Sequence, residues 1–131
     1  MIVERKQRRR QKKSSTNELL QKAVIGYLAQ ALPPTAFFRL FPPSSGGLFH
    51  GLRMRDLGLR EGFPNLLVLH DGCAYCIELR TGGLPLPSQR DCYAALQDAR
   101  IPVTVARSLE DVQRFLCEEC ALPMRNWRSA A

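Results

Sequence analysis

The chain has 131 residues, of which 45% are hydrophobic, and these values fit one globular domain with a core of ordinary size. No apolar run approaches the ~18 residues that a membrane-spanning helix needs, and no apolar segment follows the basic N-terminus as in a secretory signal. We therefore expect a cytoplasmic protein without a membrane partner.

The net charge of +7 is concentrated at the N-terminus, where seven Lys and Arg residues stand against Glu4 and give residues 1–13 a net charge of +6. We expect residues 1–14 to form a disordered basic arm that neutralises phosphates of DNA or another nucleic acid. A tail that only aids solubility is the alternative. The expected nucleic-acid contacts are Arg5, Lys6, Arg8, Arg9, Arg10, Lys12, Lys13 and, further along the chain, Arg53.

The first predicted element is a helix from Ser15 to about Ala31, ended by Pro33 and Pro34. Ser15 and Glu18 have the spacing of a capping box. Apolar residues at helical spacing predict one buried stripe, formed by Leu19, Leu20, Ala23, Val24, Tyr27, Leu28 and Ala31.

Four strands are expected next, at residues 36–41, 66–69, 75–79 and 102–106, with a tight turn at Asp71-Gly72. Further helices are predicted at 49–57, carrying Arg53, at 88–99, and after Ser108, which can cap the last one. Residues 15–120 thus form the predicted α/β domain, and residues 121–131 a loosely held tail.

Five cysteines in a chain without a secretory signal favour reduced thiols. Cys73-x-x-Cys76 and Cys117-x-x-Cys120 have the spacing of zinc ligands, so a thiolate-zinc structural protein is one hypothesis. One pair falls on a hairpin, and the other on a helix without Gly or Pro. This context favours small buried thiols instead.

Polar residues stand at fixed points of the central hairpin. Asn65 precedes the first apolar strand, in Gly62-Phe63-Pro64-Asn65, and Glu78 and Arg80 end the second. Residues two apart on a strand share a face, and the turn folds the region of Asn65 back beside them. The pattern is one by which a sheet can carry a metal site.

This order of residues resembles the VRR-NUC domain of the PD-(D/E)XK nucleases, whose motif runs Gly-x-Pro-Asp, an apolar strand, a turn and Glu-x-Lys. The resemblance covers residues 15–116 and extends through 43–47, 57–62 and 105–109. It implies a restriction-endonuclease-like αβββαβ core, with a mixed four-stranded sheet flanked by helices. It also implies endonuclease cleavage of DNA with Mg²⁺ or Mn²⁺.

The resemblance further implies a role for each matching residue. Glu18 is the helical acid that completes the metal site, Asn65 replaces the metal-bridging Asp, and Arg80 replaces the catalytic Lys. Gln89 matches the Gln at the start of the following helix. The implied catalytic set is Glu18, Asn65, Glu78, Arg80 and Gln89, and the implied metal ligands are Glu18, Asn65, Glu78 and the carbonyl of Leu79.

Asn65 in place of the motif Asp and Arg80 in place of the motif Lys leave more than one function open. Asn keeps an oxygen ligand but removes a negative charge, and Arg cannot act as a base at neutral pH. A nucleic-acid-binding module with the nuclease fold is therefore the alternative to an active enzyme. By analogy with small nucleases that cut two strands, we also expect a homodimer.

Each predicted site residue has a structural alternative as well. Glu18 could close its capping box, and Asn65 could bind main-chain groups near the strand entry. Glu78 and Arg80 could form a surface ion pair, and Gln89 could be an ordinary helix-start residue.

Overall fold

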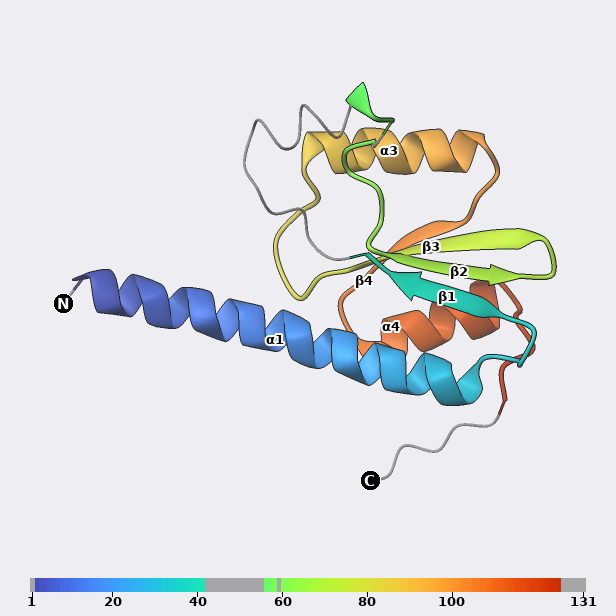
Figure 1. Cartoon of the computed structure of the whole chain (residues 1–131), viewed down its shortest axis with the longest axis horizontal. Helices are drawn as coiled ribbons and strands as arrows, with labels where there is room; N and C mark the ends of the chain where they lie inside the picture. The colour runs from blue at the N-terminus through green and yellow to red at the C-terminus, as the bar shows by residue number, and fades with distance from the viewer. Residues whose placement is uncertain (1, 42–55, 59, 126–131) are drawn as a thin grey trace. The chain divides into compact units, whose positions relative to one another are not determined.

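The computed structural model describes residues 2–41, 56–58 and 60–125, with the main chain alone for residues 2–15. The elements are α1 (Ile2–Ala31), β1 (Phe37–Leu40), β2 (Leu66–His70), β3 (Cys73–Leu79), α3 (Pro87–Asp98), β4 (Val103–Ala106), α4 (Leu109–Arg114) and η1 (Phe115–Glu119), a π-helix (Figure 1). The predicted αβββαβ order and α/β class are confirmed.

The strands form one mixed sheet in the order β1-β2-β3-β4. Antiparallel pairing joins β1 to β2 and β2 to β3, with Leu66 opposite Ile77. The amides of Cys76 and Arg80 donate to the carbonyls of Pro102 and Ala106, at 2.9 and 3.1 Å. Because donors and acceptors advance together along the chain, β3 and β4 run parallel.

The β2–β3 turn takes the form that its sequence predicts. Asp71 and Gly72 both have positive φ, at 50° and 74°. A two-residue turn with two positive φ values matches the twist of the strands, and Asp-Gly is suited to it.

The chain divides into two compact units, which are described separately. The sheet unit comprises Thr35–Glu78 and Gly83–Val105. The helical unit comprises Met1–Pro34, Leu79–Gly82 and Ala106–Ala131.

The core of the sheet unit combines residues of the hairpin with residues of α3. Leu66, Val68 and Ile77 are fully buried in the two central strands, and Cys92 and Tyr93 are buried on α3. Alternate residues of β2 point inward because successive side chains of a strand face opposite ways.

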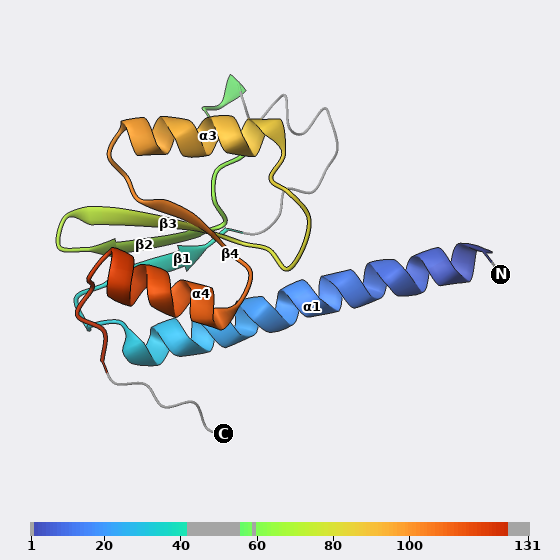
Figure 2. The same cartoon turned by 180° about the vertical axis from the view of Figure 1, so that it is seen from behind.

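The helical unit is built where α4 packs on the second half of α1 (Figure 2). The α1 residues in its core are Leu20, Val24, Tyr27, Leu28 and Ala31, and Val112, Phe115 and Leu116 are buried on α4 and η1. Ser108 caps α4 as predicted, because its hydroxyl accepts the amide of Asp111 at 3.2 Å.

The expected start of the first helix at Ser15 is wrong, since α1 begins at Ile2 and includes residues 2–14, where we expected a disordered arm. Residues 4–13 are all Glu, Arg, Lys or Gln, which favour helix, so nothing in their sequence stops it before Ser15. Glu18 therefore closes no capping box. Leu19 and Ala23 are exposed and do not belong to the buried stripe.

Part of the expected loose tail is held to the end of α1. Leu122 is buried. Arg125 donates from its amide to the carbonyl of Ala31 at 2.6 Å, and from Nε to that of Leu32 at 3.0 Å. These bonds satisfy carbonyls that the helix end leaves without intrahelical partners. The predicted helix at 49–57 lies mostly outside the described residues, and Arg53 lies outside them entirely.

No helix among the described residues is both long and apolar enough to cross a membrane.

Burial of the Cys76 thiol makes the stability of the sheet unit fall at alkaline pH. Loss of solvation, followed by the effect of Cys92, raises the pKa of the Cys76 thiol to about 11. The unfolded chain ionises this thiol first, from roughly pH 8.5. The stability that Cys76 contributes is therefore present below that pH and is lost as the pH rises toward about 11.

We expect the free energy of unfolding, measured by urea titration at a series of pH values, to fall less steeply over this window in Cys76→Val than in the wild type. Cys73→Val, which removes an exposed thiol, is the control and should follow the wild-type slope. Equal slopes for Cys76→Val and the wild type would contradict this account.

Candidate functional site

The central hairpin brings Asn65 and Glu78 together at its open end. One step beyond the Leu66–Ile77 pair, the antiparallel register places Asn65 opposite Glu78. The amide of Asn65 donates to Oε2 of Glu78 at 3.1 Å, and the Glu78 side chain is only 8% exposed. A main-chain donor thus orients a nearly buried carboxylate, and the expected proximity of these two residues is confirmed.

The segment before Asn65 is held against the start of α3. Gly62 has a φ of +81°, and a methyl group there would collide with the main chain of Ser88 and Gln89. Only Gly allows both this conformation and this close approach. Pro64 is buried two residues later, so the chain entering Asn65 has little freedom.

Gln89 lies in the first turn of α3. Its Oε1 accepts the amide of Leu86 at 2.8 Å, which satisfies a donor at the helix start. The helix-start role that we gave as the alternative for Gln89 is therefore present.

In the helical unit, α1 is tied to the segment after β3 by a residue that the sequence analysis did not select. Oδ1 of Asn17 accepts both the amide of Thr81, at 3.1 Å, and its hydroxyl, at 2.6 Å. Its neighbour Glu18 is exposed on the same helix. The sequence analysis did not select Asn17 because it interpreted residues 15–18 as a capping box, in which only Ser15 and Glu18 have a role.

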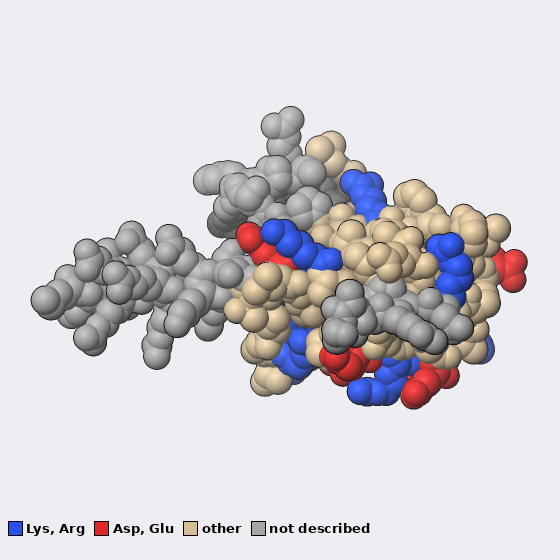
Figure 3. Space-filling view, turned by 90° about the horizontal axis from the view of Figure 1, so that it is seen from below, with Lys and Arg blue, Asp and Glu red and all other residues tan. Residues whose placement is uncertain are grey.

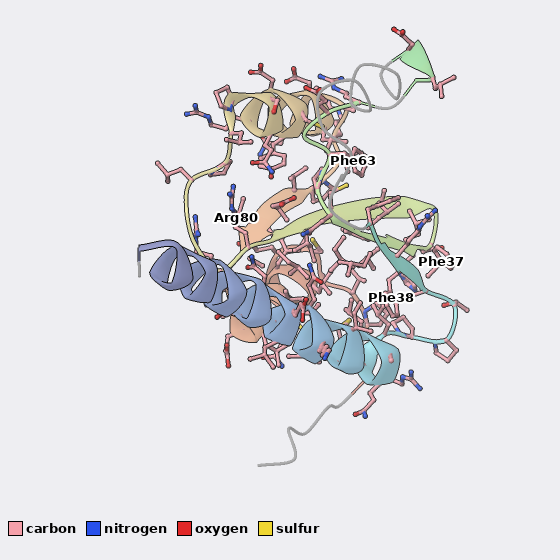
Figure 4. The ribbon with its side chains drawn as sticks, turned by 60° about the vertical axis from the view of Figure 1, so that its left-hand side comes forward. Phe37, Phe38, Phe63 and Arg80 are labelled. Atoms are coloured by element: carbon pink, nitrogen blue, oxygen red, sulfur yellow. The ribbon has the colours of Figure 1, made fainter. Side chains whose placement is uncertain are left out.

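Arg80 directly follows β3 and is half-buried (Figure 4). Its Nε donates to the carbonyl of Gly82 at 3.2 Å, while its amide continues the pairing with β4. This bond inside the turn sets the direction of the guanidinium. The sheet unit therefore carries Asn65, Glu78 and Gln89, and the helical unit carries Glu18, Leu79 and Arg80.

No protein-family model and no curated protein matches the sequence. Among solved structures, a VRR_NUC domain protein has a TM-score of 0.62 with this chain at 15% sequence identity, and the match covers 82% of this chain and 89% of that chain. The fold is that of a VRR_NUC domain protein. The resemblance seen in the hairpin residues is thus confirmed for the fold. Activity has to be argued from the site, because one fold serves many functions.

Within the VRR-NUC fold, the oxygen-rich end of the hairpin fits a hard cation better than a soft one. Glu78 supplies a carboxylate and Asn65 an amide oxygen, ligand types that Mg²⁺ accepts. With Asn in place of Asp, the set of Glu18, residue 65 and Glu78 carries a formal charge of minus two, not minus three. The roles of these residues and of the Leu79 carbonyl stay predictions.

The zinc hypothesis gains no support from the cysteines. Cys73 is exposed at the start of β3, whereas Cys76 is buried three residues on, and residues three apart on a strand face opposite ways. In the part of the chain that the structure describes, no three His, Cys, Asp or Glu residues form a group that could hold a metal ion.

The predicted nucleic-acid contacts at residues 5–13 lie on α1, where only the main chain is described. On the face shown in Figure 3, the described Lys and Arg side chains are interspersed with Asp and Glu, with no continuous basic patch among them. In the sequence, residues 1–13 carry +6 of the net charge of +7.

Asn17→Ala should lower the free energy of unfolding by about 1 kcal/mol, because one substitution removes the acceptor of two hydrogen bonds at a partly solvated position. Asn17→Asp, which keeps the acceptor oxygen, should stay closer to the wild type. Gln30→Ala, at another exposed polar position of α1, is the control and should change stability by less than about 0.5 kcal/mol. Urea unfolding measures all three, and an equal effect at Asn17 and Gln30 would remove the proposed tie.

Proposed function

We propose that this chain hydrolyses phosphodiester bonds of DNA with a divalent metal ion, in the manner of a VRR-NUC nuclease. The main support is the bond between the amide of Asn65 and the nearly buried carboxylate of Glu78, at the end of a hairpin in a nuclease fold. A carboxylate is costly to bury, so a nearly buried one in this position supports a functional role for Glu78.

By the resemblance, the residues that would hold Mg²⁺ or Mn²⁺ are Glu78, Asn65, Leu79 through its carbonyl, and Glu18. The bound ion would polarise the phosphate and activate a water molecule. The water oxygen joins phosphorus, the ester P–O bond breaks, and a proton passes to the leaving oxygen. Arg80 orients the phosphate and offsets its charge, a task that suits the fork of a guanidinium. It takes no proton from water, because it stays charged at neutral pH.

With Asn at position 65, this site should bind the metal ion more weakly than it would with Asp. Two unit charges 4 Å apart interact by on the order of 4 kcal/mol at an effective dielectric of about 20. Loss of one carboxylate therefore reduces occupancy by powers of ten at a given Mg²⁺ concentration. Cleavage should require more metal than a site with three carboxylates would.

A nucleic-acid-binding module without efficient hydrolysis is the second candidate. Two observations favour it: residue 65 carries no charge, and Nε of Arg80 already bonds to the carbonyl of Gly82. The module would hold DNA at the same surface without enough metal to cut it.

A cleavage assay separates the two candidates. Plasmid and branched DNA are incubated with Mg²⁺ or Mn²⁺ and the wild type, Glu78→Gln, Asn65→Asp, Arg80→Lys or the last two changes combined. Glu78→Gln keeps an acceptor for the Asn65 amide but removes the charge, so we expect cleavage to fall at least a hundredfold. Asn65→Asp should lower the metal concentration needed for half-maximal cleavage by at least tenfold.

Gln30→Ala is the control and should cleave like the wild type. If the wild type is inactive and the combined variant cuts, the binding-module candidate is correct. If Glu78→Gln cuts as fast as the wild type, the proposed site is wrong.

The proposed partner is nucleic acid, and the salt dependence of its binding can be measured. Affinity for a duplex, measured by fluorescence anisotropy, should fall steeply with salt, because each neutralised phosphate releases counterions. Replacing the seven Lys and Arg residues of 5–13 by Gln should make the slope of log affinity against log salt clearly shallower. An unchanged slope would assign the phosphate contacts to the rest of the chain.

A homodimer and a cytoplasmic location stay predictions. Sedimentation with and without DNA would test the former, because two cuts on opposite strands are most simply made by two sites.

A further inference from the structure

Arg39, Phe41 and Phe63 of the sheet unit form a side-chain cluster that takes no part in the proposed hydrolysis. The guanidinium carbon of Arg39 lies 4.9 Å from the ring centroid of Phe41. The rings of Phe41 and Phe63 meet edge to face, with centroids 6.0 Å apart and planes 82° apart. Arg39 is exposed, and Phe63 keeps 39% of its surface exposed.

Asn65 connects this cluster to the candidate site. Its carbonyl accepts the amide of Phe41 at 2.7 Å, and its own amide donates to Glu78 at 3.1 Å. Phe63 lies two residues before Asn65 in the chain. The exposed ring therefore belongs to the segment that leads directly into the candidate site.

The ring of Phe63 is held in place before any ligand arrives. The main chain at Gly62 packs against Ser88 and Gln89, and the buried Pro64 follows. Phe41 supports the ring from the side, at a geometry that aromatic pairs favour. A ring ordered in advance loses little conformational entropy on binding.

We propose that Phe63 is a stacking site for an unpaired nucleobase, with Phe41 as its support and Arg39 as a cation for the adjoining phosphate. This inference rests on the proposed function and adds to it a residue that would bind a base beside the candidate site. Every base offers a π-face, so stacking tolerates any sequence. In a paired duplex that face is already covered by the neighbouring bases, so an unpaired base is preferred.

Phe37 supplies a matched comparison within the same unit. It is 61% exposed, more than Phe63, but it lies at the other end of β1, opposite Leu69 (Figure 4). The described cation–π and ring contacts of this unit join Arg39, Phe41 and Phe63. Exposure of a Phe ring alone therefore does not define the site.

The test uses the full chain with Trp127→Phe, which removes its one native Trp, and places Trp at position 63 or at position 37. Two duplexes carry overhangs with equal numbers of phosphates, one with bases and one with abasic residues. Binding is followed in EDTA, where metal-dependent cleavage cannot occur. Trp emission reports stacking, and anisotropy of a dye on the DNA reports binding.

We expect the base-bearing overhang to quench the emission of Phe63→Trp and the abasic overhang to leave it unchanged, with no quenching of Phe37→Trp by either. Phe63→Leu, which keeps the packing with Phe41, should bind the base-bearing overhang roughly tenfold more weakly and the abasic one within twofold of the wild type. This difference would not arise from a merely structural role.

Equal losses by Phe63→Leu for both overhangs, or unquenched Phe63→Trp emission on bound DNA, would overturn the stacking site and leave the proposed hydrolysis standing. Quenching in a protein that never cuts DNA would support the stacking site while the hydrolysis fails. If the wild type binds neither duplex at low salt, both proposals are wrong.

Discussion

The candidate site depends on the antiparallel pairing of β2 with β3. With Leu66 opposite Ile77, the register allows the Asn65 amide to reach the carboxylate of Glu78, a residue that is only 8% exposed. On its other side Asn65 accepts the amide of Phe41, which continues the pairing of β1 with β2. Through its main chain, Asn65 thus contacts both the acid of the candidate site and the segment that carries the Phe41 ring.

Side chains and loop residues fix the ends of the elements in both units. Asn17 joins α1 to the turn after β3, Gly62 brings the strand entry against α3, and Arg125 binds the last carbonyls of α1. Each contact is worth little alone, since a hydrogen bond contributes roughly 1 kcal/mol net. Their importance lies in position, because they lie beside residues of the candidate site or at the end of the helix that carries Glu18.

The sequence predicted what depends on local pattern and failed where tertiary context decides. Two apolar runs joined at Asp71-Gly72 predicted the hairpin, and the ordered residues around it predicted the nuclease fold. The predicted helix start was wrong because the basic run before Ser15 contains no Gly or Pro and consists of residues that favour helix. Asn17 and Phe41 were missed because Thr81 and Phe63, their partners, lie in other segments. The tail at Arg125 was missed for the same reason.

The β2–β3 hairpin can accept extra residues at its turn but not between its strands and the Asn65–Glu78 end. The turn at Asp71-Gly72 lies five residue pairs from the Asn65–Glu78 end, or about 17 Å along the strands. Extra residues added symmetrically at the turn would leave the register intact. A single inserted residue within either strand would turn every side chain beyond it to the opposite face. Related chains should therefore vary freely in the length of this turn but keep an unbroken count between each strand and its polar end.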